Sequence, residues 1–209
     1  MSEKIPARPL VWIDCEMTGL DVENDALVEV AVVITDEELN ILDPGIDLLI
    51  KPSAQALENM NDFVRNMHTK SGLLAELEQG ISLVEAERQV LAYVKRFVPQ
   101  PKRGLLAGNS IGTDKMFLDR YMPSLMNHLH YRVVDVSSVK ELAKRWYHRA
   151  FEEAPVKNGG HRALADILES IQELVYYRKV LFPAGEGPSR EECRQVASEV
   201  VELGIAQQQ

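Results

Sequence analysis

The hydrophobic pattern of the first 50 residues predicts three neighbouring β-strands. Residues 10–17 and 26–35 are runs of β-branched and apolar side chains, which are typical of buried strands. A third run, residues 39–50, contains the pair Pro44-Gly45, a signal for a turn or a bulge. The links between the three runs are short, so we expect an antiparallel meander at the start of the chain.

From about residue 54 the spacing of the apolar positions becomes helical. The clearest helix is predicted at residues 82–98, where Ser82 and Glu85 form a capping-box pattern and Pro99 ends the run. The elements predicted after it are a strand at 104–109, a helix at 113–122, a strand at 131–136, a helix at 137–147 and a long helix at 161–182. A meander followed by alternating helices and strands predicts an α/β fold, in which helices flank a mixed five-stranded sheet whose later strands are parallel.

The last part of the chain has a different composition. The stretch PAGEGP is typical of a linker. The residues after it predict one more helix, because Ser189 and Glu192 form a second capping-box pattern and Gly204 ends the apolar stripe. We therefore expect one domain at residues 1–182, followed at residues 183–209 by the linker, a helix packed on the body or on a partner, and a tail.

The composition is that of an ordinary globular protein. Of the 209 residues, 45% are hydrophobic and 26% are charged, and the net charge at pH 7 is −9. A basic track that grips long nucleic acids is not evident, although bound metal ions can supply local positive charge. No apolar run approaches the length of a membrane span, and the N-terminal residues lack the apolar core of a signal peptide. Cys15 and Cys193 suggest no disulfide framework, so we expect a cytoplasmic protein without membrane contact.

The first predicted strand carries two acids, Asp14 and Glu16, on one face. Side chains alternate along a strand, so Ile13 and Cys15 share the opposite face. The two carboxylates are roughly 6.6 Å apart along the strand and repel each other unless a cation lies between them. One interpretation is therefore a metal site. The other is a strand end that reaches solvent before a Thr-Gly turn, with both acids hydrated.

A third acid, Asp114, lies in the predicted helix at 113–122. It shares one stripe of that helix with Phe117 and Leu118, at positions i+3 and i+4, so we expect it to face inward. The alternative is an acid in the first helical turn, where the helix dipole favours a negative charge. The two interpretations are compatible.

A fourth acid follows a pair of glycines. Gly159 and Gly160 form a flexible hinge before His161, which opens the predicted long helix. Asp166 lies five residues further on, away from the centre of the apolar stripe of that helix. Taken alone, this spacing favours an aspartate on the surface and an unremarkable histidine.

Together the acids and the histidine suggest a catalytic metal site. A ligand set of carboxylate oxygens suits Mg²⁺ or Mn²⁺. Two such ions, about 3.5–4 Å apart, bind the attacking and leaving oxygens in phosphoryl displacement. A histidine on a flexible segment suits a general base for water, because imidazole titrates near neutral pH. The candidate ligands are Asp14, Glu16, Asp114 and Asp166, and the candidate base is His161.

The order and spacing of these residues resemble a known enzyme family. Four segments carry the resemblance: WIDCEMTGLD, AGNSIGTDKMFLDRYMP, HLHYRVVDVSSVKELAKRWY and HRALADILESI. They are similar to the oligoribonucleases, which are DEDDh 3′–5′ exonucleases with a ribonuclease H-like fold, and the resemblance covers about residues 8–182. It implies a homodimer that degrades very short RNA, especially dinucleotides, to 5′-mononucleotides. It also implies that the four acids bind two divalent ions and that His161 deprotonates the attacking water.

The resemblance also indicates which residues contact the substrate. Leu20 matches a leucine that wedges against one base, and Phe63 matches an aromatic residue that stacks on the other, where many relatives have the larger tryptophan. The positions that match phosphate contacts are His68, Ser110, Tyr131, Arg132 and Ser137. Arg132 suits bidentate phosphate recognition, although without the family it reads as a surface arginine. In the family a partner loop closes the site at the 5′ phosphate, which excludes long chains and needs no basic track.

Three other functions stay open at this point. A broader 3′–5′ exonuclease that trims RNA or DNA ends is disfavoured by the acidic charge and by the Tyr131-Arg132 pair. A scaffold with the same fold but no catalytic activity is disfavoured, because the four acids and His161 are all retained. The last alternative is a soluble α/β domain with scattered surface acids.

Overall fold

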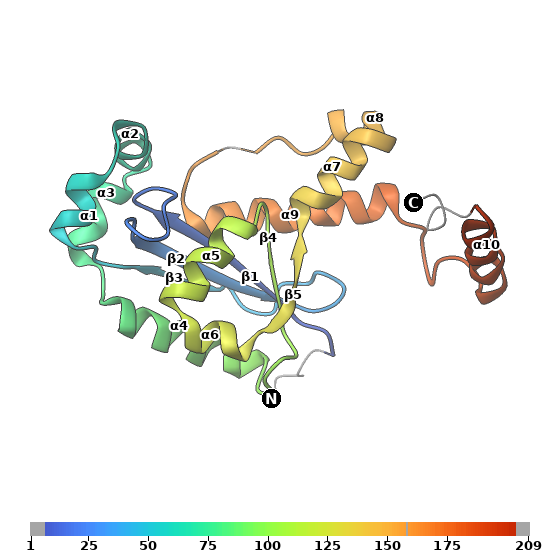
Figure 1. Ribbon diagram of the computed structural model, residues 1–209, viewed down its shortest axis with the longest axis horizontal. Helices are drawn as coiled ribbons and strands as arrows, with labels where there is room; N and C mark the ends of the chain where they lie inside the picture. The colour runs from blue at the N-terminus through green and yellow to red at the C-terminus, as the bar shows by residue number, and fades with distance from the viewer. Residues whose placement is uncertain (1–6, 158, 204–209) are drawn as a thin grey trace.

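The computed structural model describes residues 7–157 and 159–203, and its centre is a five-stranded sheet with helices on both faces (Figure 1). The strands are β1 (Leu10–Met17), β2 (Leu27–Thr35), β3 (Ile46–Leu49), β4 (Leu105–Gly108) and β5 (His130–Asp135). Their order across the sheet is β3-β2-β1-β4-β5. β2 pairs antiparallel with β1 and β3, whereas β1, β4 and β5 are parallel. The predicted mixed sheet, an antiparallel meander followed by parallel strands, is confirmed.

The two faces of the sheet are covered by different helices. One face packs against α4 (Leu83–Phe97), α5 (Gly112–Tyr121) and α6 (Pro123–His128), and the long helix α9 (Ala163–Leu181) covers the other. On β1, Ile13 and Cys15 join the core on the α4 side, while Trp12 packs under α9. The alternation predicted for the first strand is therefore confirmed, and both of its faces are buried.

Three short helices cover the sheet near the start of β2. They are α1 (Ala54–Asn59), α2 (Asp62–Lys70) and α3 (Leu73–Glu76), followed by a 3₁₀ turn, η1 (Leu77–Gln79). Leu73 and Leu77 pack on Val28 of β2. Beyond β5, the chain forms α7 (Val136–Trp146) and α8 (His148–Glu152), which contact α9 (Figure 1). Within residues 7–157 and 159–203, no helix is both long and apolar enough to cross a membrane.

Three details of the predicted elements are wrong. The third predicted strand shrinks to β3, because the chain turns at Gly45, whose φ of +94° suits glycine. The predicted long helix starts at Ala163, because the backbone of His161 has a φ of +49°, outside the helical range. The first capping box is half formed: Ser82 accepts a hydrogen bond from the N–H of Glu85, but the Glu85 carboxylate binds other side chains of α4.

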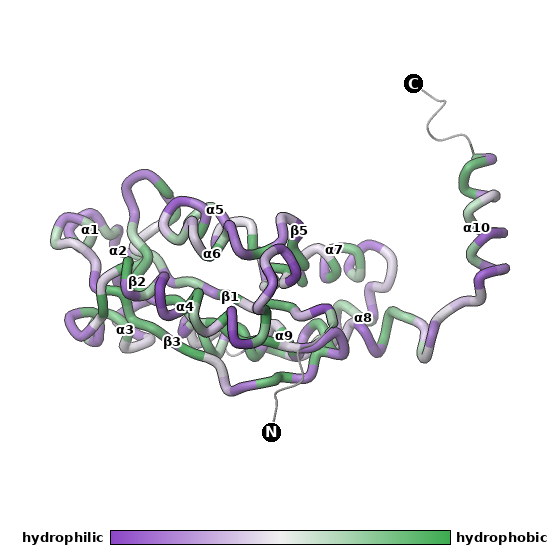
Figure 2. Tube along the Cα trace, turned by 90° about the horizontal axis from the view of Figure 1, so that it is seen from below, coloured by the Kyte–Doolittle hydropathy of each residue, from purple (hydrophilic) through white to green (hydrophobic). Residues whose placement is uncertain are grey.

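The C-terminal helix, α10 (Arg190–Glu202), stands apart from the rest of the chain (Figures 1 and 2). It begins with the predicted capping box, in which Ser189 and Glu192 each accept a hydrogen bond from the backbone N–H of the other. All of its side chains are exposed, including the valines of its apolar stripe. The division of the chain at residue 182 stays a prediction, and Gly204, expected to end the helix, lies outside the described residues.

Candidate active site

Asp14 and Glu16 lie on the part of β1 that extends beyond β4. The ladder between these strands ends at Trp12 and Ala107, whereas the ladder between β1 and β2 continues to Met17. Asp14 is half-buried and Glu16 is buried. The two acids therefore lie at the carboxyl end of a central strand, the edge at which α/β sheets bind ligands.

Asp114, in the first turn of α5, reaches the same end of β1. Its Oδ1 accepts a hydrogen bond of 3.0 Å from the backbone N–H of Cys15, the residue between the two acids. The Asp114 side chain is only 7% exposed, which confirms that it faces inward. Burial raises the pKa of Asp114 to about 7, although hydrogen bonds from backbone N–H groups oppose the shift.

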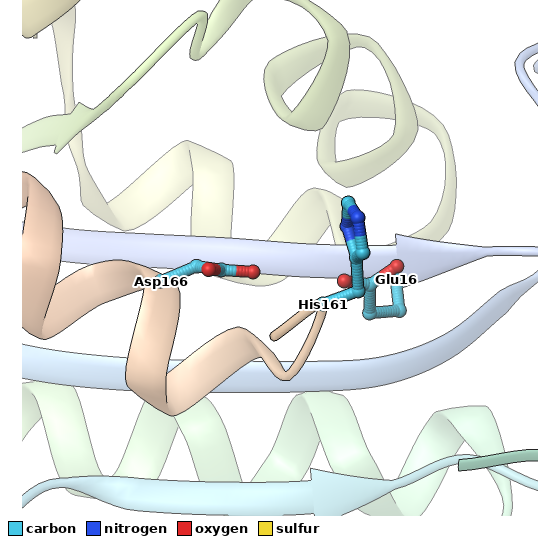
Figure 3. A group of neighbouring side chains, drawn as sticks. All are labelled: Glu16, His161 and Asp166. Carbon is cyan, nitrogen blue, oxygen red and sulfur yellow. The ribbon is translucent and has the colours of Figure 1, made fainter. Parts of the chain in front are cut away.

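His161 and Asp166 complete the cluster from the start of α9 (Figure 3). One ligand atom each from Glu16, His161 and Asp166 lie within 4.8 Å of one another. Asp166 is half-buried and its carboxylate is directed toward the other two side chains, so it is not the surface aspartate that helical spacing alone favours. His161 is exposed, and its left-handed backbone places the imidazole beside the end of β1.

The carboxylates of this cluster raise one another's pKa. Burial raises the pKa of Asp14 to about 9, and the charges of Asp114 and Glu16 add to the shift. Burial raises the pKa of Glu16 to about 8, and the next contribution comes from Glu29 in β2. Burial also raises the pKa of Asp166. Oxygen donors that repel one another when charged fit a divalent cation, because its charge offsets the repulsion.

The stability of the metal-free protein is expected to fall as the pH rises from about 5 to about 9. The pKa of Asp14 increases from 3.8 to about 9, and that of Glu16 from 4.5 to about 8. Between these limits the folded protein binds more protons than the unfolded chain, so raising the pH favours unfolding. Thermal unfolding in EDTA across this pH range measures the decline.

Two comparisons isolate the contribution of the acidic cluster to this decline. Mg²⁺ should reduce it, because a cation that binds the charged carboxylates competes with their protons. Asp14→Asn should also flatten it, since the most strongly shifted group is removed. A melting temperature in EDTA that rises with pH, or that depends on pH equally in both proteins, contradicts the raised pKa values.

Leu20 and Phe63 line one cavity beside Glu16. The two side chains are 74% and 77% exposed. With Glu16 they bound a cavity of about 360 Å³. Phe63 also lines a second cavity, of about 560 Å³, together with Gly160 and His161. The structure therefore brings both residues expected to contact bases next to the acidic cluster.

The turn that carries Leu20 is held by Asp25. The Asp25 carboxylate accepts hydrogen bonds of 2.9 Å from the hydroxyl of Thr18 and from the backbone N–H of Asp21. Gly19 is required in this turn, because a Cβ at that position would lie 2.3 Å from Oδ2 of Asp25. Leu20 is therefore exposed on a turn with a defined shape.

His68 is buried beside the acidic cluster. Its Nε2 lies 2.8 Å from the backbone carbonyl oxygen of Met17, so this nitrogen carries a hydrogen and donates. Its Nδ1 has no hydrogen-bond partner among the described residues and lies 3.9 Å from the Glu16 carboxylate. Burial lowers the pKa of His68, which favours the neutral ring. A hydrogen bond from Nδ1 to a phosphate therefore requires protonation of His68.

Ser110 and Ser137 are joined by one carboxylate. Oδ1 of Asp135 accepts hydrogen bonds from the backbone N–H of Ser110 at 3.0 Å and from that of Ser137 at 2.9 Å. The hydroxyl of Ser137 also donates to this oxygen, at 2.6 Å. The two serines predicted to contact phosphate thus lie together, between the end of β4 and the start of α7.

Tyr131 and Arg132 lie on β5 and are exposed. The Arg132 guanidinium stacks over the Tyr131 ring, with 5.6 Å between the guanidinium carbon and the ring centroid. In the part of the chain that the structure describes, no hydrogen bond or ion pair connects either residue to the acidic cluster.

Sequence reasoning missed two buried glutamates, Glu29 in β2 and Glu173 in α9. Glu29 is completely buried and accepts hydrogen bonds from Arg162 and Ala163. Glu173 is 2% exposed and pairs with lysines from α7 and from the segment before α9. The signal for Glu29 is present in the sequence, because it is the only charged residue of a strand whose nine residues are all buried.

The sequence is similar to known exonucleases over most of its length. The profile of the exonuclease family RNase_T matches residues 11–174. An oligoribonuclease from Leifsonia xyli subsp. xyli is 63% identical over 197 residues, which cover 94% of this chain and 95% of the relative. An oligoribonuclease from Streptomyces coelicolor is 57% identical, covering 92% of this chain and 96% of the relative. One from Mycobacterium leprae is 52% identical, with coverage of 91% and 89%.

The fold is similar to that of exonuclease I, a ribonuclease H-like fold. The exonuclease I of Methylocaldum szegediense superposes with a TM-score of 0.61 and 18% identity, over 83% of this chain and 41% of that one. E. coli exonuclease I in complex with a dT13 oligonucleotide superposes with a TM-score of 0.64 and 12% identity, again over 83% and 41%. The present chain thus spans less than half the length of those enzymes, and at this identity the likeness concerns the fold alone.

Proposed function

Because the chain belongs to the oligoribonuclease family and is a 3′–5′ exoribonuclease, we propose that it hydrolyses short oligoribonucleotides, above all dinucleotides, to 5′-mononucleotides. The observation that supports the proposal is the convergence of Glu16, His161 and Asp166 within 4.8 Å, beside the cavity lined by Leu20 and Phe63. That cavity, of about 360 Å³, suits one base and its ribose better than an extended strand.

Exonuclease domains of this family depend on divalent metal, and the acidic cluster fits one. We propose that Asp14, Glu16, Asp114 and Asp166 hold two ions, Mg²⁺ or Mn²⁺, because all four donors are carboxylates. When bound, the ions supply positive charge to the scissile phosphate and to the attacking and leaving oxygens. The chain itself contributes the rigid end of β1 and the first turns of α5 and α9, which fix the four carboxylates.

His161 is the proposed general base. It takes a proton from the attacking water as the water oxygen forms a bond to phosphorus. The bond from phosphorus to the ribose 3′ oxygen breaks, and this oxygen takes up a proton. The products are a 5′-mononucleotide and an RNA with a free 3′ hydroxyl. His161 suits this role because it is exposed, lines a cavity beside Phe63 and lies next to Glu16 and Asp166.

Base and phosphate contacts complete the proposal. Leu20 and Phe63 bracket the bases from the two sides of their shared cavity, and a phenyl ring stacks on any base. The residues proposed to contact phosphates are His68, Ser110, Ser137, Tyr131 and Arg132. Linear dinucleotides fit the same contacts, because they present the same groups.

A homodimer is proposed because, among the described residues, no hydrogen bond or ion pair joins Tyr131 or Arg132 to the acids of their own chain. On the surface of β5 they are free to reach the site of a second copy, where they would cap the 5′ phosphate of the substrate. A capped site explains how a protein of net charge −9 binds RNA, because it binds one terminal phosphate and does not need to bind a long backbone.

A broader exonuclease that trims RNA or DNA ends is the second candidate function, and the acidic charge disfavours it. Both cysteines are free, in accord with the cytoplasmic location that we propose.

The proposal is tested with 5′-phosphorylated RNA of two to seven nucleotides, in Mg²⁺ or Mn²⁺ and in EDTA. We expect cleavage only with the metal and the highest kcat/KM for the dinucleotide. Equal values at all lengths would favour the broader exonuclease and contradict the capped site.

Arg132→Ala is expected to lower kcat/KM for the dinucleotide by about 10- to 100-fold. This is the loss expected when hydrogen bonds between charged groups are removed. The heptanucleotide should be affected less, so the length preference should shrink. The matched control is Arg145→Ala, an exposed arginine of α7 that pairs with Glu141 of the same helix and should leave both rates unchanged. An intact dinucleotide preference in Arg132→Ala would rule out the cap.

A further inference from the structure

The segment that carries His161 has an unusual backbone conformation. Gly159 has a φ of +62° and His161 a φ of +49°, a backbone conformation that residues other than glycine rarely adopt. A Cβ added at Gly159 or Gly160 would meet nothing within 4 Å, so the space on the Cβ side of both residues is open. The two residues that follow His161 make contacts that hold this end of the segment in place.

Glu29 supplies those contacts from β2. Its Oε1 accepts a hydrogen bond of 2.8 Å from Nε of Arg162, and its Oε2 accepts one of 2.9 Å from the backbone N–H of Ala163. Arg162 is the N-cap residue of α9 and its own side chain makes no capping bond. Glu29 thus takes the place of a local cap, and its negative charge suits the positive end of the helix.

Arg162 also reaches a second element. Its Nη2 lies 3.0 Å from the carboxylate of Glu76, at the end of α3. The guanidinium therefore bridges β2 and α3, and it uses two different nitrogens to do so. A planar group held at two points has a defined orientation, which a single ion pair does not give.

The register of the sheet connects this bridge to the acidic cluster. Glu29 pairs directly with Glu16 across β1 and β2. One member of this cross-strand pair, Glu16, belongs to the acidic cluster. The other, Glu29, binds Arg162, the residue next to His161. Glu29 is not itself available to a metal or a substrate, because it is completely buried and both of its oxygens accept hydrogen bonds.

We propose that Arg162, held by Glu29 and Glu76, is a positioning residue that fixes the imidazole of His161 beside Glu16. The proposal rests on the proposed role of His161 as general base. It predicts that Arg162 affects the rate only through that imidazole. The start of α9, and with it Asp166, stays fixed without Arg162, because Oε2 of Glu29 still accepts the N–H of Ala163.

The test is a double-mutant cycle between Arg162→Gln and His161→Ala, measured on the dinucleotide. Arg162→Gln alone should lower kcat by about 10- to 100-fold and change KM by less than about threefold, as expected for a residue that orients a catalytic group. In the His161→Ala background it should lower kcat by less than about twofold, because the group that it positions is absent. The Mg²⁺ concentration that gives half the maximal rate should stay within about threefold in each variant.

Three further variants separate positioning from the loss of charge and from other changes in α9. Arg162→Gln leaves the buried carboxylate of Glu29 without its partner, whereas Glu29→Gln/Arg162→Gln removes both charges. If the unpaired charge caused the loss, the double variant would regain the wild-type rate and the inference would be wrong. Arg162→Lys keeps the charge but cannot bridge two carboxylates, so it should give an intermediate kcat. Arg178→Gln, which breaks an ion pair of the same helix with Glu38, should leave kcat unchanged.

The outcomes distinguish this inference from the proposed function. An equal loss of rate from Arg162→Gln with and without His161 would overturn the positioning role alone. Full activity of His161→Ala by itself would refute the general base, and the inference with it. Melting temperatures of all variants, measured by circular dichroism, show whether a lost rate reflects lost folding. If Arg162→Gln does not fold, Arg162→Lys replaces it in the cycle, with the same expected loss of effect on His161→Ala.

Discussion

Asp14→Asn is expected to lower kcat by roughly 10³-fold or more and, at the same time, to make the metal-free protein more stable. Asparagine has the shape of aspartate but no charge, so the cluster loses one of the ligands proposed for the divalent ions. Charges placed at the transition state of phosphoryl transfer typically contribute factors of this size. The stability should rise because burial and the neighbouring Asp114 and Glu16 disfavour the charged form of Asp14.

Opposite signs of the two effects mark a functional site, and a structural acid would not produce them. The rate is measured on a dinucleotide in saturating Mg²⁺, and the stability by thermal unfolding in EDTA at pH 8. Asp119→Asn is the matched control, because Asp119 lies on the outer face of α5 and pairs with Lys115. It should change neither quantity substantially. Retained activity in Asp14→Asn would refute the metal ligand, and a large loss of stability would refute the electrostatic argument.

Much of the fold and part of the site follow from local patterns in the sequence. Alternation along β1 predicts that Asp14 and Glu16 share a face, and helical spacing predicts that Asp114 faces inward; the structure confirms its burial. These predictions succeed because the three acids lie on regular elements, whose side chains have fixed directions. Asp166 also lies on a regular helix, but its neighbours come from β1 and are far away in the sequence, so its spacing alone misleads.

The features of the candidate site that local patterns missed depend on contacts between residues far apart in the sequence. The backbone of His161 is left-handed, and the two residues after it form hydrogen bonds to Glu29 of β2, which lies far away in the sequence. The sequence of residues 159–163 does not predict either feature. His68 is on a helix whose pattern does not reveal that its imidazole turns inward to Met17. Only Glu29 has a signal in the sequence, because it is a single charged residue in an apolar strand. Its partner, Arg162, lies 133 positions away. Local patterns in the sequence predict the helices and strands. The pairing and packing between those elements decide which side chains lie together in the candidate site.

His161→Ala is expected to lower kcat by about 10²- to 10⁴-fold, the contribution of a general base, while metal binding is largely retained. The distance data alone permit a second role, because ligand atoms of His161, Glu16 and Asp166 lie close enough to share one ion. The two roles predict different effects of the substitution on metal binding. A lost base leaves the carboxylate ligands intact, so Mg²⁺ should raise the melting temperature of the variant as much as that of the wild type.

The cavity beside His161 provides a second, chemical readout of the same prediction. It has a volume of about 560 Å³ and is lined in part by Gly159 and Gly160, so removing the imidazole leaves room for a free imidazole molecule from solution. Added imidazole should therefore restore part of the rate of His161→Ala, with a dependence on pH that follows the added base. His148→Ala, at an exposed histidine of α8, is the matched control and should show neither loss nor rescue. If His161→Ala abolishes the stabilisation by Mg²⁺ and imidazole restores nothing, the histidine is a metal ligand and the general base must be sought elsewhere in the cluster.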